Sequence, residues 1–265
     1  MPGERRGAAI EIVGLRKEYP SGRGSVLALD GLDLRVAPGE FVCIVGPSGC
    51  GKSTLLRILA GLDRQTAGTL RVEAPGWAVQ NAMVFQESGL FPWMSVEANV
   101  GFGLRTRGVA AADTAARVEA ALRLVGLTRF RHHYPHQLSG GMRQRSAIAR
   151  AFVTDPGMLL MDEPFAALDA QNRVILQAEL VRIWEQTRKT VVYITHSIEE
   201  ALLLGDRTVV MTAQPGRVKQ DIEVPFAHPR DLMTLASSPE LGKLKLDIWH
   251  VLEDEVMRAR AEAER

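Results

Sequence analysis

The sequence predicts an α/β fold organised around a mainly parallel β-sheet. Phe41–Val45 is a continuous apolar run rich in β-branched residues, which is typical of a strand buried on both faces. Runs at 158–161, 190–195 and 208–212 repeat this pattern, and helical patterns such as 174–184 lie between them. Strands that alternate with helices along the chain favour a parallel sheet covered by helices.

Two regions of the chain depart from this alternation. Short β-like runs at 9–13 and 32–36, flanked by glycine and proline, favour an N-terminal antiparallel β subdomain. The stretch from Val96 to Phe152 is mostly helical and has no convincing buried strand. This pattern favours a helical subdomain inserted at about 87–155.

The C-terminal part of the sequence begins with a proline-containing segment from Pro225 and continues as an amphipathic stretch with helical spacing of its apolar residues. We therefore expect one main domain over 1–225 and a short helical extension over 226–265. The helix of this extension is expected either to pack on its own core or to contact a partner.

The composition excludes several classes of protein. The chain has 265 residues and a formal net charge of +1, so it carries neither a polybasic arm nor an acidic tail. Its 46% hydrophobic residues exclude a disordered chain, and two cysteines are too few for a disulfide framework. No run of about 18 apolar residues occurs and Glu11 interrupts the apolar stretch near the N-terminus, so neither a membrane span nor a signal peptide is predicted. The expectation is a soluble, globular, intracellular protein.

Residues 46–53, GPSGCGKS, fit the phosphate-binding pattern G-x-x-x-x-G-K-[ST] and stand between a predicted strand and a predicted helix. Glycines let several backbone N–H groups turn toward one anion, and the start of the helix adds a partial positive charge. Lys52 can contact the β- and γ-phosphates of a nucleotide, and the Ser53 hydroxyl can bind Mg²⁺. The alternative is a glycine-rich turn without a ligand. The predicted nucleotide contacts are Gly46, Pro47, Ser48, Gly49, Cys50, Gly51, Lys52, Ser53 and Thr54.

Two acidic residues, Asp162 and Glu163, follow the apolar run at 158–161. Ionised carboxylates are costly inside a core, and ligands of open α/β sheets bind beyond the carboxyl ends of the strands. We therefore expect Asp162 to hold Mg²⁺ through water and Glu163 to polarise the attacking water as a general base. The alternative is a strand end that is merely capped before Pro164.

The segment LSGGMRQR at 138–145 stands between these two motifs. With this segment, the chain resembles the ATPase subunits of ATP-binding cassette (ABC) transporters over about residues 9–224. The resemblance includes the order of the motifs, which is phosphate loop, Gln86, LSGG signature, acidic strand, Asp169 and His196. It implies a P-loop NTPase core that binds ATP and Mg²⁺ and hydrolyses ATP.

The resemblance also implies a homodimer, because two cassettes of this family pair head to tail and sandwich two ATP molecules. Each site would take Lys52 from one subunit and Ser139, Gly140 and Gly141 from the other. A small hydroxyl residue and two glycines before a helix form a second anion-binding helix N-terminus, which agrees with this role. The alternative for the LSGG run is a flexible turn that caps a helix.

Four single residues take roles from the resemblance. Gln86 would sense Mg²⁺ and the γ-phosphate and form the hinge of the helical subdomain, and His196 would contact the γ-phosphate. Asp169 would lie in the segment that crosses the dimer interface, where this chain has Ala167 and the family often has serine. Tyr19 would stack on adenine, since base stacking gives affinity without strong base choice.

Residues 88–96, SGLFPWMSV, form an apolar cluster directly after Gln86. The cluster can be plain core, but the resemblance implies that the stretch Gln86–Val96 lines a groove for a short coupling helix of a transmembrane permease subunit. This segment and residues 213–217 are similar to importer cassettes of the nitrate/sulfonate/taurine type. The implied protein energises import of a small solute, works indirectly with an extracytoplasmic solute-binding protein, and lies peripherally on the cytoplasmic face of the membrane.

Two other classes of protein share some of these motifs. ABC proteins that act on nucleic acid carry long inserted coiled coils or two cassettes in one chain, whereas this chain has one cassette and no sustained heptads. GTPases and small-molecule kinases share the phosphate loop, but they lack an LSGG signature, and this chain has no N-K-x-D guanine motif. The sequence therefore predicts no nucleic-acid partner.

Overall fold

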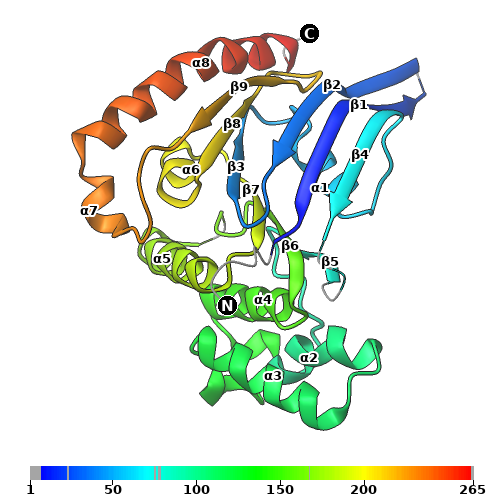
Figure 1. Cartoon of the computed structure of the whole chain (residues 1–265), viewed down its shortest axis with the longest axis vertical. Helices are drawn as coiled ribbons and strands as arrows, with labels where there is room; N and C mark the ends of the chain where they lie inside the picture. Colours follow the sequence, from blue (N-terminus) through cyan, green and yellow to red (C-terminus); the bar gives the residue numbers. More distant parts are fainter. Residues whose placement is uncertain (1–6, 23, 75, 77–78, 167, 264–265) are drawn as a thin grey trace.

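The computed structural model describes residues 7–263 except for 23, 75, 77, 78 and 167, and its centre is a six-stranded sheet (Figure 1). Neighbouring strands run parallel except β8 and β9, which are antiparallel. The predicted α/β fold with a mainly parallel sheet is therefore confirmed. In spatial order the strands are β5 (Val79–Val84), β6 (Pro156–Asp162), β7 (Thr190–Ile194), β3 (Phe41–Val45), β8 (Arg207–Met211) and β9 (Val218–Glu223).

Strand β3 lies between β7 and β8, and its five residues are all buried. Its alternate side chains enter two separate cores, because successive residues of a strand point to opposite faces of the sheet. Val42 and Ile44 pack with helix α1 (Lys52–Leu59) and the N-terminal strands. The other three residues belong to the core that includes α5 (Ala170–Thr187) and α6 (Ile198–Leu204). This double burial explains why the strand is an uninterrupted apolar run.

A second sheet contains β2 (Gly24–Val36), β1 (Ala9–Ser21) and β4 (Ala67–Glu73), in that spatial order and all antiparallel. It confirms the predicted N-terminal antiparallel β subdomain, although β1 and β2 extend beyond the predicted runs at 9–13 and 32–36. The sequence patterns did not predict β4 and β9. Both are edge strands whose residues are exposed or half-buried, so neither contains a buried apolar run.

Helices α2 (Val96–Thr106), α3 (Ala111–Leu124) and α4 (Gly140–Phe152) lie between β5 and β6 in the sequence, with short 3-10 turns at Thr128–Phe130 and Pro135–Gln137. Figure 1 shows α2 and α3 below the central sheet, with α4 nearer to it. A helical insertion is therefore present. Its limits at about 87–155, and the division of the chain into 1–225 and 226–265, stay predictions.

The C-terminal extension contains α7 (Leu232–Ala236) and α8 (Pro239–Ala263), and α8 runs along one side of the molecule (Figure 1). The buried residues Leu241, Ile248 and Leu252 pack α8 into the core that includes α6. Glu255 of α8 is only 2% exposed, and its carboxylate accepts hydrogen bonds from the backbone N–H of Ala213 and from Lys219 Nζ, both at 2.8 Å. The helix thus packs on its own core.

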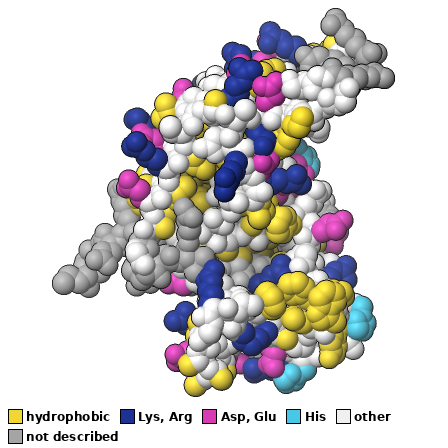
Figure 2. Space-filling model, turned by 90° about the vertical axis from the view of Figure 1, so that its right-hand side faces the viewer, with side chains coloured by type: hydrophobic (Ala, Val, Ile, Leu, Met, Phe, Trp, Pro, Cys, Tyr) yellow, Lys and Arg dark blue, Asp and Glu magenta, His cyan; other side chains and the backbone are white. Residues whose placement is uncertain are grey.

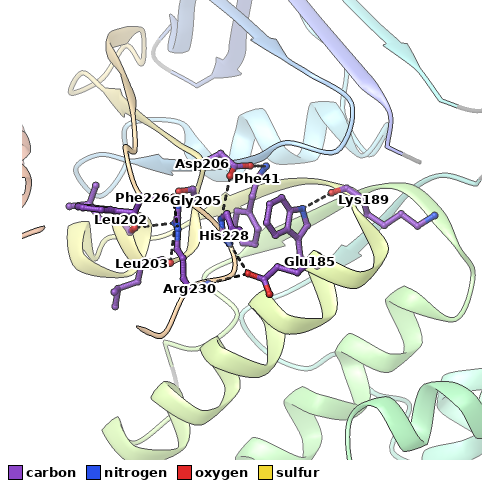
Figure 3. A network of polar contacts seen from close by, with 11 residues as sticks. Phe41, Glu185, Lys189, Leu202, Leu203, Gly205, Asp206, Phe226, His228 and Arg230 are labelled. Atoms are coloured by element: carbon purple, nitrogen blue, oxygen red, sulfur yellow. Dashed lines mark hydrogen bonds and ion pairs between the residues drawn. The ribbon is translucent and has the colours of Figure 1, made fainter. Parts of the chain in front are cut away.

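The chain between β9 and α7 is held to the core by His228 and Arg230 (Figure 3). His228 Nδ1 lies 2.8 Å from Glu185 Oε1, and its Nε2 lies 3.3 Å from Asp206 Oδ1. Burial acts to raise the pKa of Asp206, but the contact with His228, the hydrogen bond from the Phe41 N–H and the charge of Arg230 together outweigh it, so the pKa lies below its usual value. Because the last carbonyls of a helix lack partners within the helix, the Arg230 guanidinium satisfies groups at the end of α6. It donates to the carbonyl oxygens of Leu202, Leu203, Gly205 and Phe226.

Candidate nucleotide site

The residues predicted to bind phosphate and metal gather at one edge of the central sheet. The phosphate loop follows β3, Asp162 ends β6, and His196 follows β7. These three strands are adjacent and parallel, so their carboxyl ends lie at the same edge. Ligands of open α/β sheets bind at this edge.

The phosphate loop turns sharply from β3 into α1. Gly51 has a φ of 97°, and a Cβ there would lie 2.8 Å from the Ala28 carbonyl oxygen, so only glycine fits. Lys52 begins α1 and is 7% exposed. Its ammonium donates to the carbonyl oxygens of Gly46 and Pro47, each at 2.8 Å. The loop therefore holds its own cation, a compact charge suited to phosphate oxygens.

The segment after β8 packs against the same loop. The Gly216 N–H donates to the Ala28 carbonyl oxygen at 2.9 Å, and a Cβ at Gly216 would overlap the Cys50 carbonyl. In the same segment, Ala213 is hydrogen-bonded to Glu255 of α8. The C-terminal helix is thus connected to the phosphate loop through one short stretch of chain.

Ser53 and Asp162 meet, with Ser53 Oγ donating to Asp162 Oδ1 at 3.2 Å. Burial raises the pKa of Asp162, and the nearby charge of Glu163 raises it as well. The hydrogen bond from Ser53 acts in the opposite direction but does not cancel the rise. The two side chains bring a hydroxyl and a carboxylate oxygen together from α1 and β6. Since Mg²⁺ prefers oxygen ligands and takes few from protein, this pair fits a magnesium site.

Glu163 and His196 also meet, with Glu163 Oε2 lying 3.1 Å from His196 Nδ1. Glu163 has a φ of +44°, which is uncommon for a residue with a side chain, and its N–H donates to the Ile194 carbonyl oxygen at 3.0 Å. The side chain of His196 is 65% exposed. The strained turn therefore presents a carboxylate and an imidazole side by side at the edge of the sheet.

Tyr19 lies half-buried on β1 in contact with two charged residues. Its hydroxyl donates to Asp63 Oδ2 at 2.7 Å, while Lys17 Nζ lies 2.6 Å from Asp63 Oδ1 and 4.5 Å from the centroid of the tyrosine ring. The hydrogen bonds from Lys17 and Tyr19 lower the pKa of Asp63 to about 2. Lys17 therefore covers one face of the ring, so the predicted stacking of a base on Tyr19 concerns the opposite face.

Gln86 is exposed and lies just beyond the end of β5. In the part of the chain that the structure describes, no hydrogen bond joins it to the phosphate loop or to Asp162. Its neighbour Phe85 accepts a hydrogen bond at 3.4 Å from Gln144 Nε2 of α4. Gln86 therefore lies where the central sheet meets the helical insertion.

The segment after Gln86 is folded by Asn99, which is 0% exposed. The Asn99 amide donates to the carbonyl oxygens of Phe91 (3.1 Å) and Met94 (3.0 Å) and accepts from the Phe91 N–H at 2.8 Å. Trp93, at the tip of this turn, is 70% exposed. Figure 2 shows hydrophobic side chains gathered on the surface of the helical part of the molecule. The segment is therefore not plain core, because its largest side chain lies at the surface.

The signature residues lie at the start of α4. Ser139 is the N-cap of this helix, and its Oγ accepts from the Met142 N–H at 3.2 Å. Asp169 caps α5 in the same way by accepting from the Asn172 N–H at 3.0 Å. A Cβ at Gly141 would lie 3.9 Å from the Asn172 side chain, so the two caps are close together. Within the described residues, Ser139 is hydrogen-bonded to its own helix and not to the phosphate loop. Residue 167 lies outside the described residues.

The sequence patterns missed three residues that shape the site: Asp63, Asn99 and Glu200. The partners of Asp63 lie on β1, so spacing along the chain gave no signal for it, whereas Asn99 bonds to the turn directly before its own helix, a contact that apolar spacing does not reveal. Glu200 does lie one helical turn after His196, but this spacing alone does not reveal its burial.

The geometry agrees with the comparison to protein families. The family model described as ABC transporter matches residues 29–166. The chain therefore belongs to the ABC transporter family, as one of its ATP-binding and ATP-hydrolysing subunits.

Similar proteins cover most of the chain. A taurine import ATP-binding protein of Jannaschia sp. is 42% identical, over 97% of this chain and 99% of that protein. A nitrate import ATP-binding protein of Synechocystis sp. is 43% identical, over 81% and 82%. Among solved structures, the ATP-binding cassette MJ0796, described as a dimeric post-hydrolysis state bound to ADP and Pi, is 31% identical. The match covers 82% of this chain and 100% of the cassette, with a TM-score of 0.72.

Proposed function

We propose that the protein is the ATP-hydrolysing subunit of a membrane importer for a small solute and that it works as a head-to-tail dimer. The observation that carries the proposal is the pairing of Ser53 with Asp162 and of Glu163 with His196 at one sheet edge. Lys52 lies in the loop beside them. Together these groups supply the metal ligands, base and cation that hydrolysis of a nucleoside triphosphate needs.

In this proposal each residue has one task. Lys52 and the backbone N–H groups of the phosphate loop bind the nucleotide phosphates. Ser53 and Asp162 hold Mg²⁺, which supplies neutralising charge to the phosphates when bound. Glu163 orients the attacking water and accepts its proton, and His196 extends from Glu163 toward the γ-phosphate.

The signature supports the dimer. Ser139 and Gly140 are exposed, and the hydrogen bond of the Ser139 side chain stays within its own helix. A second copy can therefore present this helix N-terminus to a nucleotide held by the first copy. The similar cassette MJ0796 is described as dimeric.

Two observations support a role in import. Relatives that match most of this chain are named as taurine and nitrate import proteins, so we propose a small anionic or zwitterionic solute of this kind. The exposed Trp93 turn offers an apolar contact for a coupling helix of the permease. None of the helices in the described ranges has the length and apolar composition of a membrane span. From the likeness to import ATP-binding proteins we propose peripheral attachment at the cytoplasmic face.

The proposal is tested by Glu163→Gln, which keeps the shape of the side chain and removes the base. We expect ATP hydrolysis to fall by about 10²-fold or more while ATP binding stays within a few-fold of the wild type. The variant should also accumulate as an ATP-dependent dimer in light scattering. Glu223→Gln, at the exposed edge strand β9, is the matched control and should hydrolyse ATP at the wild-type rate.

Wild-type turnover in Glu163→Gln would remove Glu163 from the role of base, and a wild-type protein without ATPase activity would overturn the proposal. Import is tested in cells that lack the chain. Uptake of taurine, another sulfonate or nitrate should be lost and should return with the wild type but not with Glu163→Gln. Unchanged uptake of all these solutes would contradict the proposed solute class.

A further inference from the structure

We propose that Glu200 is a positioning residue for His196 and that it acts through the hydroxyl of Thr195. The inference rests on the proposed function, in which His196 extends to the γ-phosphate. Glu200 lies in the first turn of α6, four residues after His196, and is only 8% exposed. Buried carboxylates are rare unless they are paired, so the partners of this one define its role.

Three buried side chains donate hydrogen bonds to the Glu200 carboxylate. Gln177 Nε2 lies 2.9 Å and the Tyr193 hydroxyl 2.8 Å from Oε1, and the Thr195 hydroxyl donates to Oε2. Gln177 belongs to α5, Tyr193 lies near the carboxyl end of β7, and Thr195 follows that strand. The carboxylate is therefore held by two elements besides its own helix. Each carboxylate oxygen has at least one donor from within the protein, which is the arrangement of a fixed structural centre.

The same network fixes the backbone on both sides of His196. Thr195 Oγ1 accepts a hydrogen bond from the Ser197 N–H at 3.0 Å, while donating to Glu200. Ser197 Oγ accepts from the Glu200 N–H at 3.2 Å, which closes the loop over residues 195–200.

The His196 side chain depends on this backbone because it is 65% exposed and has Glu163 as its hydrogen-bond partner among the described residues. Few packing contacts restrain such a side chain. Its place at the edge of the sheet is set by the residues before and after it, and both of these are bonded to Glu200. Loss of the Thr195 hydroxyl should therefore misplace His196 without touching the nucleotide-binding residues.

The chain offers a matched pair of substitutions, one at each end of β7. Thr195 and Thr190 are 2% and 0% exposed, and each hydroxyl donates one hydrogen bond and accepts one from a backbone N–H. Thr190 lies at the opposite end of β7, where its partners are Ala8 and Gly39. Valine at either position keeps the side-chain shape and removes the same two hydrogen bonds. The two variants should therefore lose similar thermal stability.

The experiment measures kcat and KM for Mg²⁺-ATP and the melting temperature of the full chain. We expect Thr195→Val to lower kcat by about tenfold or more with KM within about twofold, and Thr190→Val to keep both constants. Thr195→Ser, which restores the hydroxyl, should return kcat to near the wild-type value. Glu200→Gln should lower kcat in the same direction, and the Glu200→Gln/Thr195→Val double variant should lose less than the product of the two single effects.

Equal kcat in Thr195→Val and Thr190→Val would overturn the inference and leave the proposed function intact, provided that the wild type hydrolyses ATP and Glu163→Gln does not. A fall in kcat that Thr195→Ser does not reverse would also overturn it. Strict additivity in the double variant would show that Glu200 and Thr195 act independently, and would overturn it as well. An inactive wild type would remove both the proposed function and the inference.

Discussion

The Asp162 carboxylate is partly buried, so its negative charge lowers the stability of the folded protein. Burial raises its pKa, and the neighbouring Glu163 carboxylate raises it further. A carboxyl group whose pKa is higher in the folded than in the unfolded state binds its proton more tightly when folded. The ionised form therefore lowers stability at neutral pH, and this cost disappears as the pH falls through the raised pKa. The Mg²⁺ ion proposed to bind here would supply the positive charge that compensates this cost.

We expect Asp162→Asn to stabilise the nucleotide-free protein at pH 7 by up to about 1 kcal/mol, because the amide keeps the acceptor for Ser53 and removes the charge. The same variant should lose Mg²⁺-dependent ATP hydrolysis. Urea unfolding at pH 7 and at an acidic pH measures the effect, and the gain should be smaller at the acidic pH. A lower free energy of unfolding at pH 7 would contradict this account.

The site residues that could be predicted from the sequence are those that belong to a short contiguous motif. The phosphate loop, the acids at the end of β6 and the LSGG run each occupy one short segment, and the first two follow parallel strands, which places them at one edge of the sheet. Glu200 and Asp63 form their contacts with residues from other elements, and their neighbours in the sequence do not reveal these partners.

At the scale of elements, the strands predicted from unbroken apolar runs are those that helices or other strands cover on both faces. Strands β3, β6 and β7 are buried along nearly their whole length, so their apolar runs are unbroken. Edge strands need no such run, because one side of each meets solvent, and β4 and β9 were missed for that reason. Helix α8 was foreseen from its apolar spacing, but the contact of its acidic Glu255 with Ala213 was not.

The end of α6 provides a test of how the C-terminal extension is held. Arg230→Leu should destabilise the protein by about 3 kcal/mol, because it leaves buried carbonyl oxygens without donors. Arg35→Leu is the matched control, since Arg35 forms a 3.0 Å ion pair with Glu11 while its side chain is 81% exposed. The control should change stability by no more than about 0.5 kcal/mol. Chemical unfolding of both variants measures the difference, and equal losses would show that Arg230 does not hold the extension.

At the scale of the whole molecule, the proposed assembly makes a prediction that a single subunit cannot satisfy. Lys52→Ala and Ser139→Arg should each inactivate the protein, the first through the phosphate loop and the second through the signature. In a head-to-tail dimer of one chain of each kind, both defects fall in one site and the other site is intact. Mixing the two inactive variants should therefore restore up to about a quarter of the wild-type ATPase activity, since half of the dimers are mixed and each has one working site.

The measurement is ATPase activity as a function of mixing ratio, with a maximum expected at equal amounts. As a control, Lys52→Ala mixed with Lys52→Ala/Ser139→Arg should stay inactive, because no pairing of these chains gives an intact site. Failure of the first mixture to regain activity, when both variants still dimerise, would argue that each chain builds its site alone.

The contact of Gly216 with the phosphate loop has a consequence for how short a working version of the protein can be. The segment that contains Gly216 also contains Ala213, whose N–H donates to the carboxylate of Glu255 in the C-terminal half of α8. A chain that ends after residue 225 would retain every motif residue but lose the hydrogen bond from Ala213 to Glu255, so we expect its affinity for ATP to fall. The minimal functional unit is therefore set by what supports the binding residues as well as by the residues themselves.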